Sequence, residues 1–276
     1  MTEVNVDPSD YPDCSGPVWC SRRGQIALVK FSRARTIRII NTLDAEGIAK
    51  LQDAFNGLRD DPEIRAVILT GAGRHDFSLR ADDKSLSALS PELALKFVRD
   101  FQKLTSTIEG LGKPVIAAID GDACGIGLDL ALCCTWRIAV SDSMFSRPGI
   151  GSGLMPGFGG LTRLAGLAGR SRALELVLTG EPIGAEKALR LNLINKITDT
   201  PQEMLEHCMR LAERLSSLAP LAIRYALESV NKGAQMSLEQ GLLLESALFG
   251  ICFSTSDVKE GTTAFLEKRT PDFKGE

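Results

Sequence analysis

A glycine-rich stretch in the middle of the chain, residues 113–132, holds the residues best suited to chemistry. It predicts a buried strand, then a tight turn, then a helix with Asp129 in its first turn. The first N–H groups of a helix have no partner within the helix and carry partial positive charge. Such a turn can donate hydrogen bonds to an anion or a polarised carbonyl oxygen. Glycines at such turns also occur for backbone geometry alone, so both interpretations stay open.

Alternating strands and helices are predicted to position this turn. Apolar runs predict strands at 25–31, 66–70, 115–119 and 194–197. Asp44 is predicted to cap one helix, and Ser90 with Pro91 to begin another. After residue 200 every periodic segment is helical: 201–216, 220–232, 237–253 and 256–268. We therefore predict a flexible lead at 1–20, an α/β core at 21–199 and an all-helical region at 200–276.

Composition limits the class of protein. The 276 residues are 44% hydrophobic and 24% charged, which is typical of a globular chain with a full core. A net charge of −3 argues against nucleic acid or an anionic membrane as the partner. The seven cysteines lack paired spacing, and no segment is a candidate signal or membrane span. We expect reduced thiols and a cytoplasmic location.

Eight separated motifs, in this order along the chain, carry a family resemblance. They are Asn41-Thr-Leu-Asp44; Ala66-Val-Ile-Leu-Thr-Gly71; Phe77-Ser-Leu-Arg-Ala-Asp-Asp-Lys84; Lys113-Pro-Val-Ile-Ala-Ala-Ile-Asp-Gly121; Phe145-Ser-Arg-Pro-Gly149; Pro156-Gly-Phe-Gly-Gly160; Leu178-Thr-Gly180; and Glu260-Gly-Thr-Thr-Ala-Phe-Leu-Glu-Lys-Arg269. Through them, the chain resembles the crotonase, or enoyl-CoA hydratase/isomerase, superfamily over about residues 21–274.

The resemblance implies a spiral of ββα repeats, followed by C-terminal helices that assemble trimers, often paired into hexamers. It implies a coenzyme A thioester as substrate, with no metal or further cofactor. The thioester carbonyl would be held by the backbone N–H groups of Ala81 and Ile126. Ile126 stands where the family usually has glycine, so its N–H points inward only if the backbone there needs no positive φ.

The same comparison of motifs places other residues around the acyl-CoA. Arg38 and Lys268 would face the phosphates of the coenzyme, with Phe265 packing beside Lys268. Residues beside the two donors and at the position of the second acid complete the expected binding set: Asp82, Gly125 and Gly149. For any single cation, a solvated surface charge is the alternative.

Hydratases that this chain resembles use two glutamates, one on each side of a water molecule. Here the first position is Asp129 and the second is Gly149, which has no side chain. Asp129 is thus the expected main acid/base, although the helix dipole alone also favours an aspartate there. Arg147, two residues before Gly149, could pair with a substrate carboxylate, neutralise Asp129 or face solvent.

Four functions fit this pattern. The first is a hydratase or isomerase in which Asp129 moves the proton, and water, a bound anion or a neighbour such as Asp82, Asp83 or His75 supplies the rest. The others are a decarboxylase of a carboxyacyl-CoA, an acyl-CoA-binding protein without turnover, and a structural partner in an assembly. Apolar residues around the helix at 237–253 suggest a subunit contact, with burial in its own domain as the alternative: Leu242, Leu243, Leu244, Leu248 and Phe249.

Overall fold

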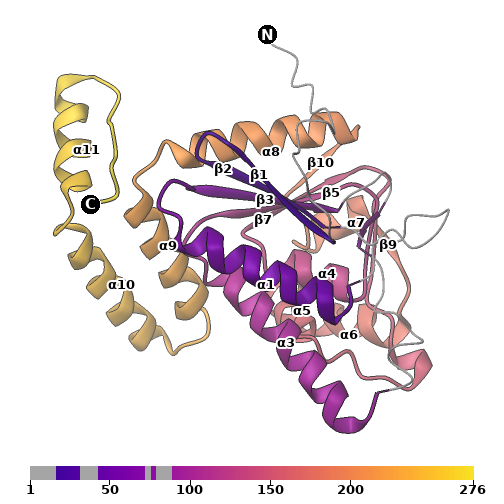
Figure 1. Cartoon of the computed structure of the whole chain (residues 1–276). Helices are drawn as coiled ribbons and strands as arrows, with labels where there is room; N and C mark the ends of the chain where they lie inside the picture. The colour runs from indigo at the N-terminus through magenta and orange to yellow at the C-terminus, as the bar shows by residue number, and fades with distance from the viewer. Residues whose placement is uncertain (1–16, 32–42, 72–75, 79–88) are drawn as a thin grey trace.

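The computed structural model describes residues 17–31, 43–71, 76–78 and 89–276, and their strands form two sheets (Figure 1). The larger sheet contains, in spatial order, β1 (Val18–Arg23), β2 (Ile26–Phe31), β3 (Ala66–Gly71), β5 (Val115–Ile119), β7 (Trp136–Val140) and β10 (Lys196–Thr198). Within this larger sheet, strands β1 and β2 pair antiparallel, and the other neighbouring strands pair parallel. The smaller sheet contains β4 (Asp76–Ser78), β6 (Asp122–Cys124), β8 (Met144–Ser146) and β9 (Ile183–Gly184).

Helices follow the strands and then continue alone to the C-terminus. Those of the α/β part are α1 (Ala45–Asp60), α3 (Pro91–Glu109), α4 (Ile126–Leu132), the 3₁₀ turn η2 (Ile150–Ser152), α5 (Gly160–Ala168), α6 (Arg170–Thr179) and α7 (Ala185–Arg190). The last four are α8 (Pro201–Ser216), α9 (Pro220–Gly233), α10 (Leu238–Cys252) and α11 (Ser256–Glu267).

One pattern of connection repeats through the α/β part. Strands β3, β5 and β7 lie in the larger sheet, and the strands that directly follow them, β4, β6 and β8, lie in the smaller one. A helix comes next in each case: α3, α4 or, after η2, α5. In each repeat the chain passes from a strand of the larger sheet directly to a strand of the smaller one. Because β6 and β8 are neighbours in the smaller sheet, the segments that follow them lie close together.

The central strands β3 and β5 of the larger sheet are buried on both faces, and their residues are almost all apolar. On one face, Ile68, Ile116 and Ile138 pack in a cluster with Met204 and Cys208 of α8. The alternate residues along the same strands face a second cluster, which includes side chains of α1 and α3: Leu69, Ala117, Ala139, Leu51, Phe55, Phe101 and Leu104. Figure 1 shows α8 on one side of this sheet and α1 on the other.

The structure confirms the predicted helix starts. Asp44 accepts a hydrogen bond from the Gly47 N–H at 2.9 Å, and Ser90 caps α3 with Pro91 in its first turn. Strand β1 begins at Val18, within the predicted lead, whose residues 1–16 lie outside the described residues. The last strand begins at Lys196, two positions later than the predicted 194.

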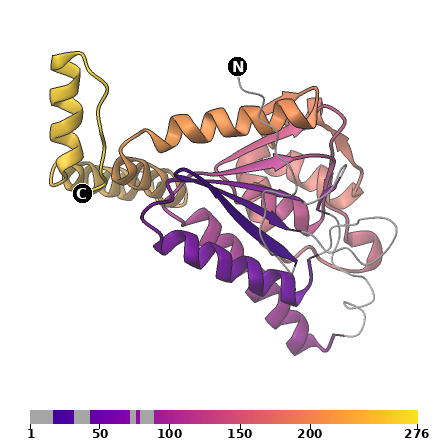
Figure 2. The ribbon, with the colours of Figure 1, turned by 45° about the horizontal axis from the view of Figure 1, so that its top comes forward.

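The C-terminal helices α10 and α11 project away from the two sheets (Figures 1 and 2). On α10, Leu238 is 80% exposed and Leu243 is 72% exposed, so this helix is not buried in its own domain. Within the described residues, no single helix has the length and apolar character to cross a membrane. Helices α10 and α11 meet that test only together, as a pair bent by 74°.

Candidate active site

An apolar cavity of about 610 Å³ lies beside the turn into α4. Its walls come from the first half of α3, the start of α4, the segment after β8, and the loop before α5. The lining residues are Leu89, Ala94, Leu95, Phe97, Val98, Gln102, Gly125, Ile126, Arg147, Pro148, Gly149, Ser152, Leu154, Met155, Pro156, Gly157 and Phe158. A volume of this order suits a small-molecule ligand.

The loop before α5 is tied to α3 by polar and aromatic contacts. The Gln102 side-chain amide donates to the Gly157 carbonyl at 2.8 Å. The Phe158 ring packs edge-on against Phe97 and Phe101, with ring centroids 5.6 and 5.5 Å away. These contacts fix one wall of the cavity.

The backbone at the start of α4 has the geometry that the sequence required. Gly125 takes the positive φ of 59° at the N-cap, and Ile126, the first helical residue, is not among the described non-glycine residues with positive φ. An isoleucine is therefore tolerated directly after the turn, because the left-handed conformation falls on the glycine before it. Gly125 and Ile126 both line the cavity, as predicted for binding residues. The expected second donor, Ala81, lies outside the described residues.

Asp129 lies behind the cavity wall, not on it. Its side chain is fully buried, and it is absent from the residues that line the cavity. The Arg147 Nη2 atom donates to Asp129 Oδ2 at 2.6 Å, and the Arg147 side chain does line the cavity. Arg147 therefore stands between the carboxylate and the cavity, and neutralising Asp129 is one of the three roles that the sequence left open for it.

Gly160, the first residue of α5, lies against the other carboxylate oxygen. A Cβ atom built on Gly160 would come within 1.5 Å of Asp129 Oδ1 and 2.2 Å of its Cγ. Asp129 Oδ1 is buried without a hydrogen-bond partner. The motif 156–160 was part of the resemblance, but its last glycine was not predicted to shape the site. Nothing in one sequence marks Gly160 as the neighbour of Asp129.

The buried ion pair changes the acidity of the carboxyl group. Burial raises the pKa of Asp129 to about 6, while the positive charges of Arg147 and Arg163 act in the opposite direction. A group that titrates near neutral pH can both accept and release a proton there. The structure thus holds one buried carboxyl group that titrates near neutral pH behind the cavity wall.

Gly149 lines the cavity, and a side chain at that position would strain the backbone and crowd its neighbours. Its φ of 156° favours glycine, and a Cβ atom would lie 3.1 Å from the Leu154 carbonyl oxygen and 3.2 Å from Pro156 Cγ. The loop thus closes over the place where a second acid would begin. Arg147 is the only ionisable residue on the described part of the cavity wall.

Two other predicted residues lie on α11, away from this cavity. Phe265 is 82% exposed and Lys268 ends the helix with a φ of 55°, and neither lines the cavity. The other predicted coenzyme contacts, Arg38 and Asp82, and the suggested helpers His75 and Asp83, lie outside the described residues.

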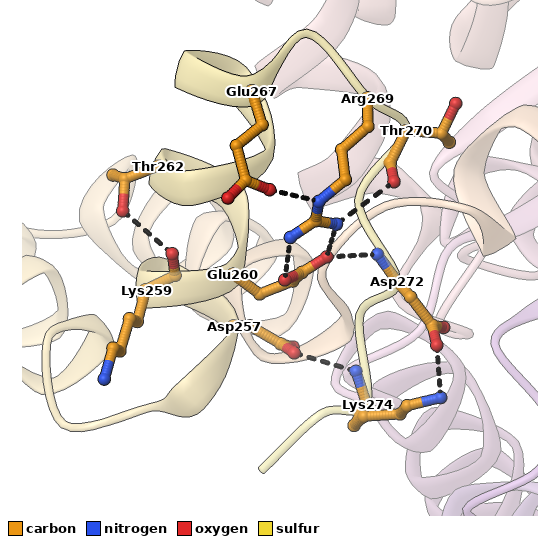
Figure 3. A network of polar contacts seen from close by, with 9 residues as sticks. All are labelled: Asp257, Lys259, Glu260, Thr262, Glu267, Arg269, Thr270, Asp272 and Lys274. Carbon is orange, nitrogen blue, oxygen red and sulfur yellow. Dashed lines mark hydrogen bonds and ion pairs between the residues drawn. The ribbon is translucent and has the colours of Figure 1, made fainter.

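A polar network holds the end of the chain against α11 (Figure 3). Arg269 makes two hydrogen bonds to Glu260, at 2.6 and 2.8 Å, and the Asp272 N–H donates to the same carboxylate. Asp257 accepts from the backbone of Lys274 at 2.8 Å. These contacts hold the segment after residue 268 against α11.

Together these features define an α/β protein with an apolar ligand cavity, a helix start that can bind an oxyanion, and one buried ion pair at the wall. The family model for enoyl-CoA hydratase/isomerase matches residues 21–276. Crotonyl-CoA hydratase of Syntrophomonas wolfei is 39% identical over 86% of this chain and 90% of its own. Short-chain-enoyl-CoA hydratase of Clostridium acetobutylicum is 37% identical over 90% of this chain and 94% of its own.

Solved structures agree. The enoyl-CoA hydratase of Bacillus anthracis superposes with a TM-score of 0.89 at 32% identity, covering 95% of this chain and all of that one. The chain belongs to the enoyl-CoA hydratase/isomerase family, and its fold is the crotonase fold. The resemblance inferred from eight motifs is thereby confirmed, as is the fold class.

Proposed function

We propose that this chain is an acyl-CoA enzyme that adds water to, or shifts, a carbon–carbon double bond next to a thioester. The observation that supports this most is the start of α4, which opens onto an apolar cavity in a chain of this family. The Ile126 N–H would donate to the thioester oxygen, together with the Ala81 N–H expected from the resemblance. Each such donor contributes on the order of 100-fold to 1,000-fold in rate, because a fixed dipole needs no reorganisation.

Asp129 is the proposed acid/base. The Arg147 side chain must move off Asp129 Oδ2 for the carboxyl group to reach the substrate, because Arg147 forms the wall at that place. A pKa of about 6 suits transfer in both directions near neutral pH. Gly149 carries no side chain, so water would have to complete the reaction at that side.

The coenzyme would extend beyond the described wall, and the resemblance assigns Arg38 and Asp82 to its contacts. Phe265 and Lys268 project from α11 and do not reach the cavity of their own chain, so they would bind the coenzyme of a second copy or close over it in an assembly. The exposed apolar side chains of α10, such as Leu243 and Phe249, supply a surface for the expected trimer or dimer of trimers.

A substrate panel tests the proposal. The purified protein is incubated with enoyl-, dienoyl- and carboxyacyl-CoA thioesters, and the conjugated thioester absorbance and carbon dioxide release are followed. Turnover of an enoyl-CoA is expected, with kcat lowered about 100-fold or more in Asp129→Asn, which keeps a hydrogen-bond acceptor for Arg147. Equal turnover in the variant would remove Asp129 from the chemistry.

Two other outcomes favour the alternative functions. Carbon dioxide release without double-bond chemistry would favour a decarboxylase, which needs enolate stabilisation and no base. Tight binding without turnover across the whole panel would favour an acyl-CoA-binding protein.

A further inference from the structure

We infer that the acyl group of the substrate carries a carboxylate, retained through the reaction, which pairs with the free edge of the Arg147 guanidinium. The inference rests on the proposed function, because it takes the cavity beside α4 as the thioester site. It names the class of acyl group that this particular wall would select.

Two N–H groups on one edge of the Arg147 guanidinium, the Nε–H and the second N–H of Nη2, have no partner among the described residues. The residue is only 4% exposed and lines the cavity. Nη2 is held by Asp129 at 2.6 Å, and Nη1 makes a long contact of 3.4 Å to the Pro148 carbonyl. Nε is buried with no hydrogen-bond partner. A buried donor without a partner is destabilising, so an acceptor from the ligand would offset that cost.

A carboxylate matches this edge better than other acceptors do. Guanidinium and carboxylate are both planar, and two parallel N–H···O bonds join them edge to edge. The surrounding wall is apolar, with Leu95, Val98 and Phe97 from α3. A charged hydrogen bond in such surroundings is stronger than one in water. Pairing with the guanidinium also opposes loss of carbon dioxide, because it stabilises the negative charge on the carboxylate, which decarboxylation would move into the acyl chain.

A second anion would change the charge of the buried cluster. Arg147 would move off Asp129 Oδ2 to pair with the incoming carboxylate, and without that cation beside it the protonated form of Asp129 is favoured. The other charged group acting on Asp129 is Arg163, itself paired with Glu109 at 2.8 Å. Substrate binding would then bring a proton onto Asp129, ready for delivery.

Matched thioesters test the carboxylate contact. Crotonyl-CoA, glutaconyl-CoA, which adds a terminal carboxylate to the same chain, and the methyl ester of glutaconyl-CoA are compared with the whole protein. We expect kcat/KM for the acid to exceed that for the ester by about tenfold or more. Arg147→Lys should keep part of this preference, and Arg147→Gln should abolish it.

A double variant protects the test against misfolding. Arg147→Gln alone leaves Asp129 buried without its cation, so Arg147→Gln is also made with Asp129→Asn, which removes both charges at similar volume. Dissociation constants of the acid and the ester are measured for this neutral variant, and equal values are expected. Calorimetry in two buffers of different ionisation enthalpy should show proton uptake by the wild type with the acid and none with the ester.

The outcomes separate this inference from the proposed function. Turnover of crotonyl-CoA with no preference between acid and ester would overturn the inference and leave the function standing. The same holds for a preference that survives Arg147→Gln, or for release of carbon dioxide from glutaconyl-CoA. No binding or turnover of any thioester would overturn the proposed function itself.

Discussion

Substituting Gly160 by alanine would test how the buried ion pair is held. The added Cβ would lie 1.5 Å from Asp129 Oδ1, whereas ordinary contact begins at 3.4 Å. The new methyl group is fixed to the backbone of α5 and cannot move away. The Asp129 carboxyl group would therefore have to move by about 2 Å. The 2.6 Å hydrogen bond to Arg147 does not survive a shift of that size.

The expected cost follows from breaking a buried pair. Breaking a buried ion pair by removing one partner costs about 3–5 kcal/mol, and we take the displacement of Asp129 from Arg147 to cost a similar amount. Alanine also restricts the unfolded chain more than glycine does, which returns about 0.5–1 kcal/mol. We expect Gly160→Ala to lower the free energy of unfolding by about 2–4 kcal/mol and to reduce kcat, because both Asp129 and Arg147 are displaced.

Urea denaturation measures this loss, with Gly166→Ala as the matched control. Gly166 lies in the same helix α5, is exposed, and has no atom within 4 Å of an added Cβ. Its substitution should be neutral or stabilising by up to about 1 kcal/mol. The two variants differ only in what the new methyl group meets.

A double-mutant cycle identifies the clashing partner. Asp129→Ala removes the Cγ and Oδ1 atoms that the Gly160→Ala methyl group would strike. The cost of Gly160→Ala should therefore be lower by about 1.5 kcal/mol or more in the Asp129→Ala background. If Gly160→Ala is as stable as Gly166→Ala, or if the two substitutions are additive, the described packing of Asp129 is wrong.

Three further predictions concern Asp129, the closed position at Gly149 and the C-terminal surface. The pKa of Asp129 is about 6 when folded against an ordinary 3.8, so the folded chain binds more protons between these values. The stability of wild type relative to Asp129→Asn should fall by about 3 kcal/mol as pH rises through that window, measured by urea denaturation. Gly149→Glu should lower the free energy of unfolding by about 1–3 kcal/mol and gain no hydratase activity, because the φ of 156° strains a side chain there and a backbone oxygen lies 3.1 Å from its Cβ. Gly151→Glu is the control, because a Cβ atom there has nothing within 4 Å. It should be neutral in the same denaturation and turnover assays. Leu243→Glu on α10, where this leucine is 72% exposed, should dissociate the expected trimer in light scattering, and Leu178→Glu, 61% exposed on α6, should not.

Local signals were sufficient for the long elements. Asp44 and Ser90 mark helix starts because their side chains bond the free N–H groups of the first turn, which needs no distant residue. Apolar runs likewise mark β2, β3 and β5 of the larger sheet, whereas β1 and β7 were not predicted. The strands of the smaller sheet have only two or three residues each, too short to show a period, so they were not predicted.

The candidate site likewise has features that the sequence predicted and contacts that it did not. The turn at Gly125 and Ile126 was predicted because its donors belong to the backbone of one continuous segment. The sequence also showed that Gly149 cannot transfer a proton. It did not show that residues 154–156 close over that position, because that contact depends on how a later loop folds back.

What the sequence determined by itself is the family, the order of elements, and the presence of an aspartate just inside the helix after the glycine-rich turn. Only the tertiary structure decided what that aspartate faces. Arg147 follows another strand and Gly160 begins another helix, and both meet Asp129 because the ββα repeats bring their ends together. The burial and pairing of a side chain depend on such neighbours in space. For this reason Asp129, which the sequence places at the site, lies behind Arg147 and not on the cavity wall.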